Sequence, residues 1–98
     1  MKRPSECENM QEIRLEIDRV DRALVLLLVE RAGYIDRAAQ VKGAFGLPAR
    51  IDDRVEQVVQ NVRRFAEIEG LDPTLAESLW RQVIDWSIAR EEVTLGAD

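Results

Sequence analysis

The feature that most constrains this chain is one helical pattern that begins at Met10 and runs to Lys42 without a proline. Asn9 is suited to cap its start, because its side chain accepts a hydrogen bond from the first turn, and Glu12 stands where a capping box needs it. Apolar residues then recur every three to four positions, which is the period of one helix face. This stripe comprises Met10, Ile13, Ile17, Val20, Leu24, Leu27, Tyr34, Ala38 and Val41.

A helix of this length exceeds what a small globule accommodates. At 1.5 Å per residue the helix measures about 50 Å. A compact domain of 98 residues has a radius of gyration near ~13 Å, so part of the helix projects with its apolar stripe uncovered. A second copy of the chain covers such a stripe at low cost. We therefore predict an all-α fold that forms an intertwined helical homodimer, with a monomeric bent hairpin as the alternative.

The remaining sequence predicts two shorter helices. Glycine and proline residues make 43–50 a loop. We expect the second helix to be capped by Asp52 or Asp53 at its start and by Gly70 at its end. The third helix follows the Asp72–Pro73 pair, in which a capping residue precedes a proline, and it frays after Glu92.

Composition excludes several classes of function. The chain is 46% apolar with a net charge of -5, which is enough for a core and argues against nucleic-acid binding. It has no apolar run of the ~20 residues that a membrane span needs, and its charged start differs from a signal peptide. A lone Cys7 fits a reducing cytoplasm, where we expect the protein. With no His, we predict no metal site and exclude Ser-His or Cys-His nucleophiles.

Cations interrupt the apolar stripe of the long helix. Arg31 follows Leu27 on this stripe, where a cation is costly unless it meets an anion. Lys42 lies on almost the same face, about 16 Å further along, so the two side chains are able to hold a small dianion. Arg14 lies on the same side but roughly 25 Å from Arg31. The two arginines therefore approach one ligand only between antiparallel chains.

Each of these cations also has a simpler interpretation. Salt bridges between helices, such as Arg31 with Asp85 or Glu91, account for the same residues. Arg54 lies in the first turn of the second helix, where the helix dipole disfavours a cation. It is therefore either held by another group or paired with a neighbouring aspartate.

Two positions near the end of the third helix stand out. Ser87 and Glu91 are one turn apart among apolar neighbours, where a carboxyl pairs with a cation or takes up a proton. The alternative for Glu91 is a surface position near a frayed end. Trp80 and Trp86 are expected in the core.

Together these residues resemble the all-α chorismate mutases, which are small intertwined dimers of three helices. The similarity covers nearly the whole chain and implies a single domain over 1–98, with an N-terminal arm at 1–9 and an active-site loop at 43–51. The matching residues are Ile13-Arg14-x-x-Ile17-Asp18-x-Val20-Asp21, Leu27-Leu28-x-Glu30-Arg31, Ala38-Ala39-x-Val41-Lys42, Pro48, Arg54, Gly70-Leu71-Asp72 and Ile84-Asp85-x-Ser87-Ile88.

The resemblance implies roles for these residues. Arg31 and the partner subunit's Arg14 would bind the two carboxylates of chorismate, and Arg54 would reach a carboxylate from the loop side. Lys42 would donate to the ether oxygen beside Glu91, and Ser87 would add a polar contact. The reaction is pericyclic, so no cofactor is expected. The apolar residues assigned to the site are Ala38, Val55, Val58, Ile84 and Ile88.

Some positions depart from the typical mutase. Glu91 replaces the usual Gln and donates only when protonated, and Val55 replaces a Glu that accepts from the substrate hydroxyl. The lead Lys2-x-Pro4-x-x-Cys7-x-x-Met10 looks like that of the isochorismate-pyruvate lyases of salicylate synthesis, although their loop is shorter. We predict a chorismate mutase. The alternatives are a lyase acting on isochorismate and a non-catalytic helical dimerisation module.

Overall fold

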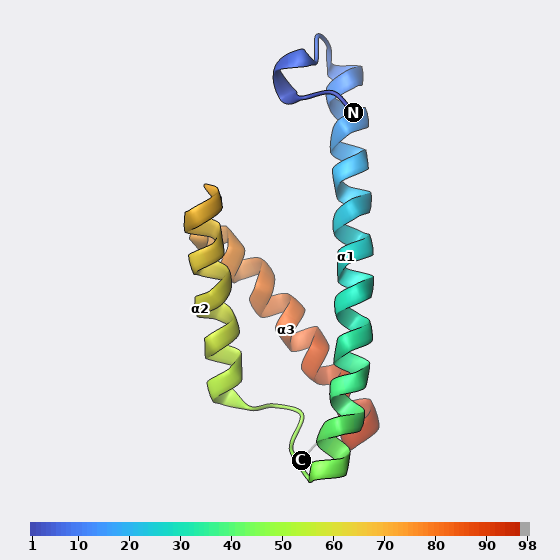
Figure 1. Cartoon of the computed structure of the whole chain (residues 1–98), viewed down its shortest axis with the longest axis vertical. Coiled ribbons are helices and arrows are strands. Elements are labelled where there is room, and N and C mark those ends of the chain that lie inside the picture. Colours follow the sequence, from blue (N-terminus) through green and yellow to red (C-terminus); the bar gives the residue numbers. More distant parts are fainter. Residues whose placement is uncertain (97–98) are drawn as a thin grey trace. The chain divides into compact units, whose positions relative to one another are not determined.

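A computed structural model describes residues 1–96, all of whose regular elements are helices (Figure 1). This confirms the all-α prediction. The elements are the short 3-10 helix η1 (Pro4–Glu6) and the α-helices α1 (Met10–Phe45), α2 (Asp52–Glu69) and α3 (Pro73–Leu95). The chain divides into two compact units, residues 1–33 and the part that begins at Tyr34. None of the helices within 1–96 has the length and apolar character of a membrane span.

The first unit contains η1 and the N-terminal turns of α1. The Asn9 side chain accepts a hydrogen bond from the Glu12 amide at 2.9 Å, as the capping pattern predicts. The Lys2 ammonium lies 2.9 Å from the Glu12 carboxylate, and the Glu8 amide donates to the same side chain. The hydrogen bond from Lys2 lowers the pKa of Glu12. These contacts attach the N-terminal arm to the first turns of α1.

The apolar stripe of α1 in this unit is largely exposed in the single chain. Every side chain in the run 24–29 is exposed, as are Leu15, Ile17 and Val20. Continuous exposed apolar surface of this kind is typical of regions that bind another molecule. The exposure agrees with the uncovered stripe that the helix length predicts.

The second unit contains the last turns of α1, the loop, α2 and α3. The predicted end of the first helix at Lys42 is wrong, because the helix continues to Phe45. Gly43 is accommodated there, and a side chain at this position would approach Leu95 to 3.3 Å. The helix ends where Gly46 takes a φ of 67° and the Leu47 amide donates to the Lys42 carbonyl at 2.8 Å. The loop is therefore 46–51, shorter than the expected 43–51.

The ends of the other helices confirm some caps and correct others. The N-cap of α2 is Ile51, without a side-chain hydrogen bond, so the predicted Asp52 or Asp53 cap is wrong. Both aspartates lie in the first turn, where the helix dipole stabilises a negative charge. Gly70 is left-handed at φ 83°, and Asp72 accepts a hydrogen bond from the Thr74 amide, as expected. The end of α3 lies at Leu95, three residues beyond the expected Glu92.

The core of the second unit lies where α2 and α3 pack along each other (Figure 1). The predicted core position of Trp80 is confirmed, because this side chain packs against the buried cluster. Trp86 is 53% exposed, so its predicted core position is wrong. The residues that form the cluster are Val55, Val59 and Ile84, with Val58, Trp80 and Ile88 packed against them.

We predict that Gly70→Ala destabilises the protein by about 1–2 kcal/mol, because the left-handed conformation crowds a side chain against its own backbone. Open space surrounds the position, so no packing term contributes. Gly70→Asn is the matched control, since asparagine tolerates this conformation better, and it should recover part of the loss. Urea unfolding measures both variants. Equal stability of Gly70→Ala and wild type would contradict the assignment.

Candidate active site

The central group of the candidate site is the ammonium of Lys42, on the last turns of α1. Its Nζ donates to Glu91 Oε1 at 2.6 Å and to the Ala49 carbonyl at 2.7 Å. The side chains of Lys42 and Glu91 are only 19% and 5% exposed. The ammonium therefore joins α1, the loop and α3. Because a lysine has three N–H donors, these two bonds leave one donor for a further acceptor.

Glu91 belongs to a face of α3 on which polar and apolar groups alternate by turn. Ile84, Ser87, Ile88 and Glu91 follow the three-to-four spacing that places side chains on one side of a helix. Ser87 is buried, and its hydroxyl donates to the Val83 carbonyl at 2.7 Å. Of the alternatives for Glu91, the structure shows pairing with a cation rather than a surface position.

The structure brings most of the predicted apolar site residues together. Val55 and Val58 of α2 meet Ile84 and Ile88 of α3 in the core cluster. Ala38, on α1, is partly buried. The predicted wall of the site is therefore also the core that holds α2 against α3.

The arginines predicted to bind the substrate carboxylates are divided between the two units. Arg54 donates to the Gln57 side chain at 2.7 Å, so of its two alternatives the structure shows a hydrogen bond to another group. Arg14 is exposed and Arg31 is partly buried, and both lie on α1 in the first unit. Their convergence with the Lys42 group stays a prediction. The Asp85 carboxylate lies 4.0 Å from the Arg50 guanidinium.

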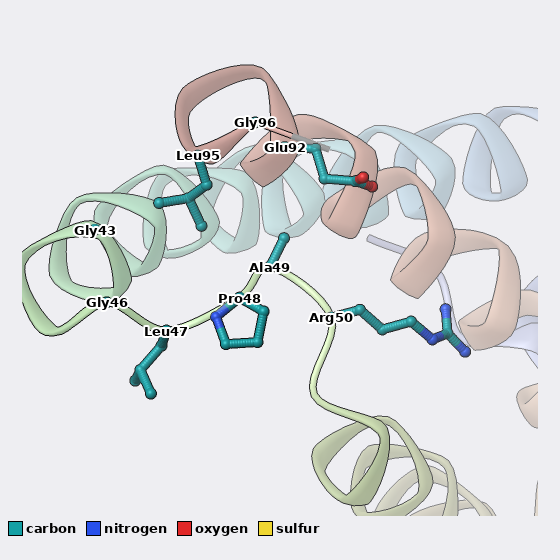
Figure 2. Close-up of a pocket in the computed structure, with 9 residues that line it drawn as sticks. All are labelled: Gly43, Gly46, Leu47, Pro48, Ala49, Arg50, Glu92, Leu95 and Gly96. Atoms are coloured by element: carbon teal, nitrogen blue, oxygen red, sulfur yellow. The ribbon is translucent and has the colours of Figure 1, made fainter. Parts of the chain in front are cut away.

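The loop and the end of α3 enclose a separate hollow of about 440 Å³ (Figure 2). Neither Lys42 nor Glu91 lines it. Figure 2 shows the Ala49 methyl pointing toward α3, while the Arg50 side chain extends away from Leu47 and Pro48. The hollow is thus a neighbour of the predicted site and does not replace it.

Sequence reasoning missed two features of this region. One is the Ala49 carbonyl, which has no side-chain signal. The other is a bidentate pair in which Arg90 Nε and Nη2 donate to the Asp36 carboxylate at 2.7 and 3.0 Å. The hydrogen bond from Arg90 lowers the pKa of Asp36. Opposite charges in both helices were the only signal, and they do not specify a partner.

The groups assembled here suit one kind of chemistry. A cation with a spare donor lies beside a carboxyl group on an apolar helix face. Such a site is able to stabilise charge that develops on a substrate oxygen. Within residues 1–96 there is no group of three or more His, Cys, Asp or Glu placed to hold a metal ion.

Comparison with known proteins agrees with this chemistry. The family described as chorismate mutase type II matches residues 13–92. An isochorismate pyruvate lyase of Pseudomonas aeruginosa is 36% identical over 92 residues, covering 93% of this chain and 89% of that protein. A T-protein of Enterobacter agglomerans is 34% identical over 81% of this chain, which spans 21% of its length. A chorismate mutase of Methanocaldococcus jannaschii is 22% identical over 87% of this chain and 86% of that protein.

The family match extends from the first turns of α1 to the residue after Glu91 and includes the Lys42–Glu91 pair. The chain therefore belongs to the chorismate mutase type II family.

Proposed function

We propose that this protein is a chorismate mutase, an isomerase that rearranges chorismate to prephenate in aromatic amino acid biosynthesis. The observation that carries the proposal is the Lys42 ammonium, held beside Glu91 on the buried face of α3. The family match supports it. We take 1–98 as one chorismate-mutase-like domain that works in the cytoplasm.

The reaction is pericyclic and needs no nucleophile from the protein. Its barrier falls when the substrate is held in its compact diaxial form and the charge on the ether oxygen is stabilised. The remaining N–H of Lys42 is the donor for that oxygen. Val58, Ile84 and Ile88 supply the apolar wall that excludes water, and Ser87 adds a polar contact.

The effect of Glu91 on this step depends on whether its carboxyl group carries a proton. As a carboxylate it accepts from Lys42 and repels the negative charge that develops on the ether oxygen. With a proton it becomes a second donor to the same oxygen. In the free protein Glu91 is paired with Lys42.

The two substrate carboxylates require cations beyond Lys42. Arg31 and the partner subunit's Arg14 bind them in a homodimer, and Arg54 contributes from α2. The exposed apolar run at 24–29 supports this assembly, because a second α1 covers it. Paired arginines recognise carboxylates with bidentate geometry.

A lyase acting on isochorismate is the second candidate. The Pseudomonas lyase covers nearly the whole chain at 36% identity, and Val55 lies where the mutases have a glutamate. The deciding experiment offers chorismate and isochorismate separately to the purified protein. Prephenate identifies a mutase, whereas salicylate with pyruvate identifies a lyase of salicylate biosynthesis. Loss of neither substrate favours the non-catalytic dimerisation module.

The shared site predicts complementation between two inactive variants. Arg14→Ala and Arg31→Ala should each abolish most activity, since each removes a carboxylate ligand. Mixed together after subunit exchange, they should regain activity, because a heterodimer contains one intact site. Light scattering gives the assembly state. An active monomer would refute the shared site.

The Lys42→Ala variant should lose on the order of 10²–10³ in kcat, the usual effect of removing a donor to a developing oxyanion. This change also strands the buried Glu91 carboxylate. The control is therefore Lys42→Met in a Glu91→Gln background, compared with Glu91→Gln alone, where no charge is stranded. Near-normal turnover of that double variant would make Lys42 purely structural.

The Glu91→Gln variant should raise kcat/KM, because a glutamine amide donates to the ether oxygen whereas a carboxylate only accepts. The change also removes a negative charge beside the oxygen on which negative charge develops. Measuring kcat/KM for both proteins under one set of conditions tests this. Equal values would show that Glu91 does not face the reacting oxygen.

A further inference from the structure

A second ion pair lies between the same two helices as the Lys42–Glu91 pair. Asp36 and Lys42 belong to α1, about 9 Å apart along its axis, while Arg90 and Glu91 are consecutive on α3. Each helix thus contributes one cation and one anion, in opposite order. The Arg90 guanidinium also lies over the Trp86 ring, 5.7 Å from its centre.

The outer pair contributes little to stability by itself. The Arg90 and Asp36 side chains are 50% and 47% exposed, and exposed ion pairs are worth roughly 0–1 kcal/mol. A hollow of about 400 Å³ at Asp36, Gln40 and Arg90 gives water access to it. Its distinctive property is geometry, because two parallel N–H···O bonds fix the relative orientation of guanidinium and carboxylate.

That geometry matters because the groups of the inner pair also act on the substrate in the proposed reaction. In the free protein Lys42 donates to Glu91, and with substrate its remaining N–H also donates to the ether oxygen. The placement of both groups depends on the spacing between the last turns of α1 and α3. A tie outside the site fixes this spacing with groups that take no part in the reaction.

We propose that Asp36 and Arg90 are positioning residues, a bidentate pair that holds the last turns of α1 against α3 so that Lys42 and Glu91 stay aligned on the substrate. This inference rests on the proposed function. The pair does not touch the substrate, so its loss acts on the chemical step through Lys42.

The test compares Asp36→Asn with Glu56→Gln. Glu56 of α2 lies 3.3 Å from Arg81 of α3. The two side chains are 59% and 45% exposed, which is similar to the exposure of the Asp36–Arg90 pair. Because a small misplacement of catalytic groups is costly, Asp36→Asn should lower kcat about tenfold and leave KM nearly unchanged. Glu56→Gln should leave both near wild type. Asp36→Glu restores the carboxylate and should regain most of kcat.

The outcomes separate the two proposals. If wild type converts a substrate and Asp36→Asn matches Glu56→Gln in kcat, or Asp36→Glu does not rescue, the positioning role is wrong. If wild type converts neither chorismate nor isochorismate, the proposed function fails. In that case urea unfolding of Asp36→Asn, Glu91→Gln and their double variant tests whether the two ion pairs are coupled. Non-additive changes of about threefold or more in the unfolding constant support it, and additive changes overturn it.

Discussion

The Lys42–Glu91 ion pair is a buried contact that joins α1 to α3 in the second unit. Removing both charges from water costs several kcal/mol per ion, and only good geometry with further hydrogen bonds repays it. The Ala49 carbonyl provides one such bond. A hydrophobic pair of similar volume often serves stability as well as a buried ion pair does. The presence of these charges is therefore better explained by chemistry than by folding.

The backbone near this pair follows from its requirements. Continuation of α1 through Gly43 to Phe45, followed by the left-handed Gly46, determines where the loop turns back. The short loop then places the Ala49 carbonyl 2.7 Å from the ammonium. The longer loop that the sequence pattern predicts, 43–51, gives no indication of this contact.

The core and the candidate site share one face of α3. Ile84 is buried among Val55 and Val59, and Glu91 lies two turns further along the same face. A substitution at Ile84 therefore affects packing and the site together. This overlap explains why an apolar position on this face does not by itself distinguish the predicted site wall from the core.

Features that depend on neighbours within a few residues follow from local sequence alone. The helices, the Asn9 and Asp72 caps and the left-handed Gly70 follow from side-chain hydrogen bonds and backbone sterics over one turn. Lys42 and Glu91 were recognisable singly, because charged groups interrupt apolar faces. Their pairing across 49 positions, the Asp36–Arg90 tie and the exposed place of Trp86 were decided only by tertiary structure. The partner of a charge is set by which helix faces meet, and the local spacing of residues does not specify those faces.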